Sequence, residues 1–81
     1  AAVQSRIDAI AKSRGYVDGV ALAGYSTSTI PTWAAEALAF VAWRDAVWIY
    51  AYTELAKVQG GQRTTPTVEA LVAELPVVVW P

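Results

Sequence analysis

Cysteine, histidine and methionine are all absent from this chain of 81 residues. Without cysteine it can form neither a disulfide nor a cysteine-ligated zinc site, and without histidine it lacks the commonest general base and metal ligand. Six basic and seven acidic side chains give a formal net charge of −1, so the basic patch that marks nucleic-acid-binding proteins is missing. We therefore expect no cofactor, no bound metal and no nucleic-acid partner.

The length allows one small domain, which we place at residues 1–81. A chain of this size is expected to bury only about 60% of the surface that it exposes when unfolded, so its stability is a concern. The first residue is alanine, which is compatible with a processed product or with the C-terminal part of a longer protein.

The N-terminal segment has the pattern of a short amphipathic helix, at about residues 3–14. Gly15 is a stop signal, and apolar residues recur at helical spacing before it, at Val3, Ile7, Ile10 and Ala11. Residues 15–30 then hold three glycines, an Asp-Gly turn signal and a run of serine and threonine, which argues against a continuous helix. We expect an ordered connection there, packed down by its apolar residues.

A long central helix is predicted at about residues 31–59. Pro31 suits a first helical turn and Thr32 can cap exposed amides, whereas Gly60 and Gly61 supply a stop signal. About 28 residues measure roughly 42 Å, but a compact chain of this length has a diameter of only about 30 Å. We expect the helix to overhang its own domain.

A second short helix is predicted at about residues 66–75. Pro66 opens it with Thr65 as the cap, and apolar residues follow at helical spacing, at Val68, Leu71, Val72 and Leu75. Pro76 ends this helix, and the closing "VVVWP" is β-branched and aromatic, which favours an extended tail. Such a tail should lie in a groove or on a partner, and the predicted fold class is all-α.

On a helical wheel the long helix presents two faces that need partners. The bulky face comprises Trp33, Phe40, Val47, Trp48, Ala51, Leu55 and Val58. Roughly opposite lies a stripe of small residues, formed by Ala35, Ala39, Ala42, Ala46 and Thr53. The stripe is either plain helix-forming surface or a place where a second helix can approach closely.

The stretch at residues 33–52 is apolar enough to raise the question of a membrane span, which needs about 20 apolar residues. Arg44 and Asp45 lie near its middle, where each would cost about 2.5 to 3.5 kcal/mol on insertion scales. We therefore favour a helix covered by protein over a helix in a membrane.

Arg44 and Asp45 offer little for catalysis. Consecutive side chains on a helix diverge by about 100°, which predicts that the two cannot act as one pair. Phe40 and Trp48 flank Arg44 at four residues on either side, so we expect their rings and a carboxylate or carbonyl of another segment to hold the guanidinium. No residue is placed to activate the serines and threonines, and no enzymatic activity is expected.

Aromatic residues are more numerous than so small a core can enclose. Tryptophan, tyrosine and arginine often anchor interfaces, so the candidate interaction residues are Trp33, Trp43, Arg44, Trp48, Tyr50, Tyr52 and Trp80. Trp43 and Tyr50 lie two turns apart on one flank and could form a contiguous patch. The alternative is that these rings fill the domain's own core.

Two stretches, "EALAFVAWRDAVW" and "TVEALVAELP", together with the order of segments over residues 5–76, carry a resemblance to a known group. The chain resembles the C-terminal region of small bacteriophage proteins associated with tails and tail fibres, of the assembly type. The resemblance implies a non-enzymatic structural component or assembly factor, present in the virion tail or in the host cytoplasm during assembly. A homo-oligomer, a tail or fibre protein as partner, or both are implied.

Two alternatives remain open from the sequence. The first is a small membrane-active phage protein, and the second, less favoured, is an enzyme that acts on the cell envelope. The second would need a carboxylate pair that the sequence does not visibly present.

Overall fold

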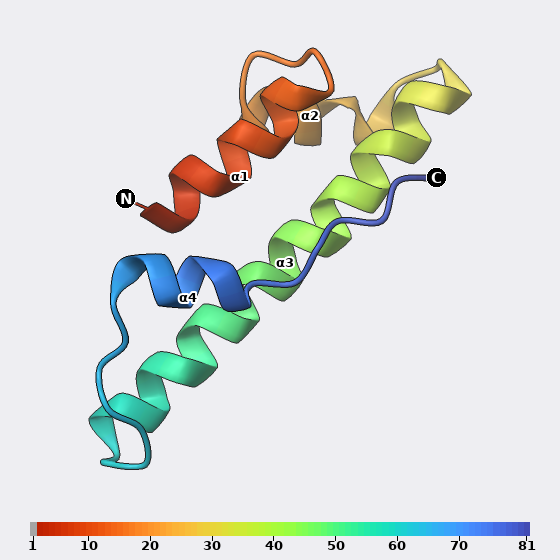
Figure 1. Ribbon diagram of the computed structural model, residues 1–81. Coiled ribbons are helices and arrows are strands. Elements are labelled where there is room, and N and C mark those ends of the chain that lie inside the picture. The colour runs from red at the N-terminus through yellow and green to blue at the C-terminus, as the bar shows by residue number, and fades with distance from the viewer. Residues whose placement is uncertain (1) are drawn as a thin grey trace.

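The fold is all-α, as the sequence predicts. The structure, a computed structural model, describes residues 2–81, and its regular elements within that range are helical. They are α1 (Ala2–Ser13), α2 (Gly19–Gly24), the 3₁₀ turn η1 (Tyr25–Thr27), α3 (Pro31–Gln59) and α4 (Val68–Glu74). Figure 1 shows α1 and α4 lying along one side of the long α3.

The central helix α3 sets the shape of the molecule. Its 29 residues measure about 43 Å, and the molecule as a whole extends over 47 × 17 × 17 Å. Pro31 occupies the first turn as predicted, but the N-cap is Ile30 and no side chain caps it. The helix ends where Gly60 N–H donates to the Ala56 carbonyl and Gly61 takes a φ of +75°.

The connection after α1 contains a short helix that the sequence reading missed. Asp18 caps α2 by accepting a hydrogen bond from Ala21 N–H at 2.8 Å. Asp8, on α1, accepts one from Gly19 N–H at 2.9 Å. A Cβ at Gly19 would lie only 3.1 Å from the nearest side-chain atoms of α1, so the missing side chain lets α2 pack closely onto α1.

One hydrophobic core joins α1, α2 and α3 with Leu75, which follows α4, and Val72 of α4 packs against it. Its buried members are Ile7, Ala11, Leu22, Ala37, Phe40, Trp43, Val47 and Leu75. α1 supplies the first two and α2 the third, while α3 supplies four. The core therefore lies along the N-terminal two thirds of α3.

The tail after α4 is extended, as predicted, and it lies on the chain itself. Trp43 Nε1 donates a hydrogen bond of 2.7 Å to the Pro76 carbonyl, which fixes the start of the tail on α3. Val78 and Trp80 pack against the core, whereas the alternate residues Val77 and Val79 are more than four-fifths exposed. Figure 1 shows the tail running back along α3 towards its N-terminal half.

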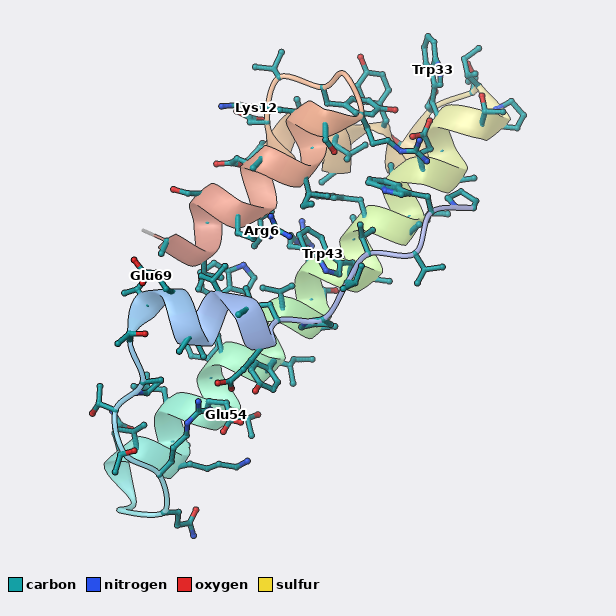
Figure 2. The ribbon with its side chains drawn as sticks, in the orientation of Figure 1. Arg6, Lys12, Trp33, Trp43, Glu54 and Glu69 are labelled. Atoms are coloured by element: carbon teal, nitrogen blue, oxygen red, sulfur yellow. The ribbon has the colours of Figure 1, made fainter. Side chains whose placement is uncertain are left out.

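The buried face of α3 is rotated from the predicted bulky face. Phe40 and Val47 are buried as expected, but Trp33 and Leu55 are about half exposed. Trp43 is buried in their place, because the tail covers the flank of α3 that carries it. Figure 2 shows Trp33 pointing away from the body of the molecule and Trp43 pointing into it.

Candidate functional site

One side of α3 carries a row of exposed residues. We call this row the outer stripe, and it comprises Leu38, Ala42, Asp45, Ile49, Tyr52 and Ala56. All six are exposed. Leu38, Ile49 and Tyr52 each leave more than half of their surface in contact with solvent. Five of the six are apolar, and Asp45 is the charged exception.

The predicted stripe of small residues borders the outer stripe and shares one member with it. Ala42, Ala46 and Thr53 are exposed, while Ala35 and Ala39 are partly buried. Thr53 satisfies its hydroxyl by donating to the Ile49 carbonyl at 2.7 Å. A flank of small side chains allows a second helix to approach closely, as the sequence reading considered.

Arg44 and Asp45 pair with each other, so the prediction that they could not is wrong. Arg44 Nη2 and Nε donate to Asp45 Oδ1 at 3.1 and 3.3 Å. The arginine side chain is long enough to bend back along the helix surface, which overcomes the 100° divergence at Cα. Both side chains are more than one-third exposed, so the expected partner from another segment is absent from this pair.

The ring stacking predicted for Arg44 is found instead at the end of α1. The Arg14 guanidinium lies 4.4 Å from the ring centroid of Trp80. Arg14 Nε also pairs with Glu36 Oε2 at 3.3 Å. Because Trp80 belongs to the tail and Glu36 to α3, Arg14 ties three segments together.

The candidate aromatic residues divide between the core and the surface. Trp43 is buried, and Trp48, Tyr50 and Trp80 pack against the core with part of each ring exposed. The patch expected from Trp43 and Tyr50 is therefore covered by the tail and α4. The structure favours the core interpretation for these two rings.

Three of the candidate rings remain available on the surface. Tyr52 stacks on Trp48 with ring centroids 5.8 Å apart, which brings the exposed edge of Trp48 beside the outer stripe. Trp33 meets Tyr25 edge-to-face at 5.7 Å and lies at the far N-terminal end of α3. Of the candidate residues, Tyr52 alone belongs to the outer stripe, with Trp48 and Arg44 bordering it.

A cluster of polar and charged side chains, which sequence reasoning missed, fastens α4 and the preceding loop to α3. We call it the clamp, and it comprises Tyr50, Glu54, Lys57, Arg63 and Glu74. Arg63 donates to Glu74 Oε2 at 2.6 Å and pairs with Glu54 Oε1 at 3.2 Å. Tyr50 donates to the other oxygen of Glu74 at 2.6 Å. Lys57 lies 3.1 Å from Glu54 Oε2 and forms an ion pair with it. The buried carboxylate of Glu54 is thus compensated by two cations.

The hydrogen bonds of this cluster shift its titration. The bond from Lys57 is the main cause that lowers the pKa of Glu54, and the bond from Arg63 is the main cause for Glu74. Donation to Glu74 raises the pKa of Tyr50. Each shift favours the protonation state that the hydrogen bonds of the cluster require.

An apolar cavity of about 170 Å³ lies between the end of α3 and α4. Ala51, Leu55, Val58, Pro66 and Leu71 form most of its wall, and Glu54 lies at its margin. Thr65 and Thr67 complete its polar lining, and Lys57 and Arg63 form ion pairs with Glu54. Across residues 2–81, no three acidic side chains are placed to hold a metal ion.

None of the helices within residues 2–81 is long and apolar enough to cross a membrane. Comparison with protein-family models, with curated proteins and with solved structures finds no match for this chain. The resemblance to phage tail-associated proteins rests on the sequence stretches at residues 36–48 and 67–76 and stays a prediction.

Proposed function

We propose that this chain acts by protein–protein association and is not an enzyme. The observation that carries the proposal is the outer stripe, an exposed apolar row along the longest helix of the molecule. Contiguous exposed apolar surface on a small soluble domain commonly marks an interaction site. Helices that present anchors at three- and four-residue intervals are a recurring means of docking on another helix or groove.

The arrangement of ionisable groups supports the same conclusion. Catalytic sites usually hold ionisable groups that are poised in a cleft with shifted pKa values. Burial is the main cause that raises the pKa of Tyr16, which lies outside the clamp. The shifted groups Glu54, Glu74 and Tyr50 are engaged with Arg63 and Lys57 in holding α4 against α3. The clamp explains their shifts without any role in a reaction.

The biological setting that we propose is the bacteriophage tail or tail fibre. The support is the resemblance of residues 5–76 to small tail-associated proteins, and the elongated all-α shape suits a component docked along a fibre or an assembly factor. In this setting the outer stripe would contact a tail or fibre protein, a second copy of the chain, or both.

Mass spectrometry of purified phage particles and direct binding to purified tail and fibre proteins of the same phage test this proposal. We expect the chain to bind at least one of these proteins, and we expect Ile49→Glu, in the outer stripe, to weaken that binding at least tenfold. Val17→Glu is the matched control, since Val17 is also exposed, at 77%, but lies on the connection after α1. Absence from particles together with no binding to any tail or fibre protein would refute the phage-tail setting.

A further inference from the structure

We infer that the outer stripe pairs with the outer stripe of a second copy of this chain, with the two α3 helices antiparallel. This inference deepens the proposed function, on which it rests, by naming one partner of the associating surface. It follows from the register of the stripe, its self-complementary side-chain sizes, its charge and the area that it can bury.

The register of the outer stripe is that of a helix seam. Its six members, Leu38, Ala42, Asp45, Ile49, Tyr52 and Ala56, are separated in turn by four, three, four, three and four residues. This alternation is the seven-residue repeat by which two helices keep one face in contact along their length. All six members are exposed, and Ile49 borders a hollow that is also lined by Glu74 and Pro76.

Side-chain size along the seam favours an antiparallel pair. In that orientation two seam residues face each other when their numbers add up to about 94. Ala42 therefore lies opposite Tyr52, and Leu38 lies opposite Ala56. Each of these layers then combines one large and one small side chain. A parallel pair would set Tyr52 against Tyr52 and Ala42 against Ala42, and it would thus alternate crowded layers with empty ones.

The borders of the seam are complementary in the same orientation. On one border the two-fold axis sets Ala46 beside Ala46, and Ala39 beside Thr53, so the helices can approach closely. On the other border the same axis sets the two copies of Trp48 beside each other. Trp48 is partly exposed next to Tyr52, and its remaining surface would be covered by its symmetry mate.

The charge of the seam also suits a second copy. Asp45 is the one charged member of the outer stripe, and its carboxylate is hydrogen-bonded by Arg44 of the same helix. Each copy therefore brings a neutral pair to the interface. The antiparallel register places Asp45 opposite Ile49, whereas a parallel register would place it opposite another Asp45, which is unfavourable for like charges.

The area of the seam sets the strength of the pair. The outer stripe runs from residue 38 to residue 56, which is about 27 Å, and one third of the circumference of a helix about 12 Å across is about 13 Å wide. The resulting contact is about 350 Å² per copy, or about 700 Å² in total. Stable complexes bury about 1,200–2,000 Å², so we expect a reversible dimer with a Kd in the micromolar range.

Sedimentation equilibrium of the purified chain, at concentrations from about 1 to about 300 μM, tests the pairing. We expect a monomer–dimer equilibrium with a Kd between about 1 and about 100 μM. Ile49→Glu should weaken dimerisation at least tenfold, because it sets a carboxylate opposite Asp45, while Val17→Glu should leave it unchanged. Circular dichroism should show that both variants keep their helical content, since both positions are exposed.

Single cysteines test the orientation, because the native chain has none. With a short bis-maleimide reagent, Ala46→Cys should cross-link into a dimer, since the two copies of this residue adjoin the two-fold axis. Ala56→Cys should cross-link much less, because its symmetry mate lies at the other end of the seam. Equal or reversed yields would overturn the antiparallel arrangement.

A monomer throughout this concentration range would overturn the inference. If Ile49→Glu then still abolished binding to a purified tail or fibre protein, the proposed function would stand, with that protein as the occupant of the outer stripe. If the chain dimerised but bound no tail or fibre protein, the inference would stand and the phage-tail setting would fail.

Discussion

Replacing Trp43 by phenylalanine tests whether the indole of this residue is the joint between α3 and the tail. Trp43 is only 6% exposed, its ring centroid lies 5.7 Å from that of Phe40, and its Nε1 donates to the Pro76 carbonyl at 2.7 Å. Phenylalanine would keep an aromatic ring in the core but remove the donor. The substitution thus separates the hydrogen bond from most of the hydrophobic packing.

The magnitude follows from two losses. Leaving the partly buried Pro76 carbonyl without its donor costs about 1–3 kcal/mol, and the smaller ring leaves a void that adds about 1 kcal/mol. We expect a destabilisation of about 3 kcal/mol. A domain of this size has a total stability of only about 4–12 kcal/mol, and each kcal/mol lowers its Tm by about 4–8 °C.

Thermal and urea unfolding followed by far-ultraviolet circular dichroism measure this loss. Trp33→Phe is the matched control, because Trp33 is 47% exposed and its contact with Tyr25 can be kept by another ring. We expect the control to change stability by less than about 0.5 kcal/mol. If the two variants unfolded within about 2 °C of each other, the role assigned to the Trp43 hydrogen bond would be refuted.

Three further predictions concern the clamp and the close approach of α2. Arg63→Met should lower the Tm measured by circular dichroism, because it leaves Glu54 buried with Lys57 as its remaining cation and releases Glu74; an unchanged Tm would show that the clamp contributes nothing. Acid should act on the same groups: the folded-state pKa of Glu54 and Glu74 is lowered from 4.5, so their contribution is present above that pH and is lost as the pH falls through the lowered values. The Tm of the wild type should therefore fall as the pH drops below 4.5, and an equal fall in Arg63→Met would contradict this assignment. Gly19→Ala should destabilise the fold by about 1–3 kcal/mol in urea unfolding, because its Cβ would crowd α1 at 3.1 Å. Gly24→Ala, with open space around its Cβ, should be neutral or slightly stabilising. Similar effects at the two glycines would contradict the packing described for α2.

The bounds of α3 could be predicted from the sequence because they depend on local backbone chemistry. Proline at residue 31 favours a helix start and the glycines at residues 60 and 61 favour a helix end, whatever the tertiary contacts. The observed helix is Pro31–Gln59. The short helix α2 could not be predicted in the same way. One of the two carboxylates that cap it is Asp8, which lies on α1, eleven residues before its partner Gly19. The sequence around Gly19 gives no sign of that contact.

The buried face of α3 was misjudged because the helix is apolar around most of its circumference. On such a helix the sequence does not decide which third of the surface faces the core. That choice is made by the tail, whose Pro76 carbonyl receives the Trp43 hydrogen bond, and by α4. The outer stripe was therefore only partly anticipated, through its small residues, while Leu38 and Ile49 were not singled out.

The clamp was missed for a related reason. Glu54, Arg63 and Glu74 are separated by nine and eleven residues and lie on three different segments, α3, the loop after it and α4. The turn at residues 60–67 folds back and brings the three together (Figure 2 marks Glu54 on α3). Charge pairs across a turn depend on its exact path, which composition and periodicity do not specify.

The return of the tail along α3 has a consequence for synthesis on the ribosome. The Trp43 indole and its acceptor at Pro76 are 33 residues apart, so translation at about 5–20 residues per second leaves this joint open for several seconds. During that interval both the flank of α3 that the tail will cover and the outer stripe are exposed to water. Early pairing between chains made on neighbouring ribosomes would shield the outer stripe first, leaving the other flank for the tail.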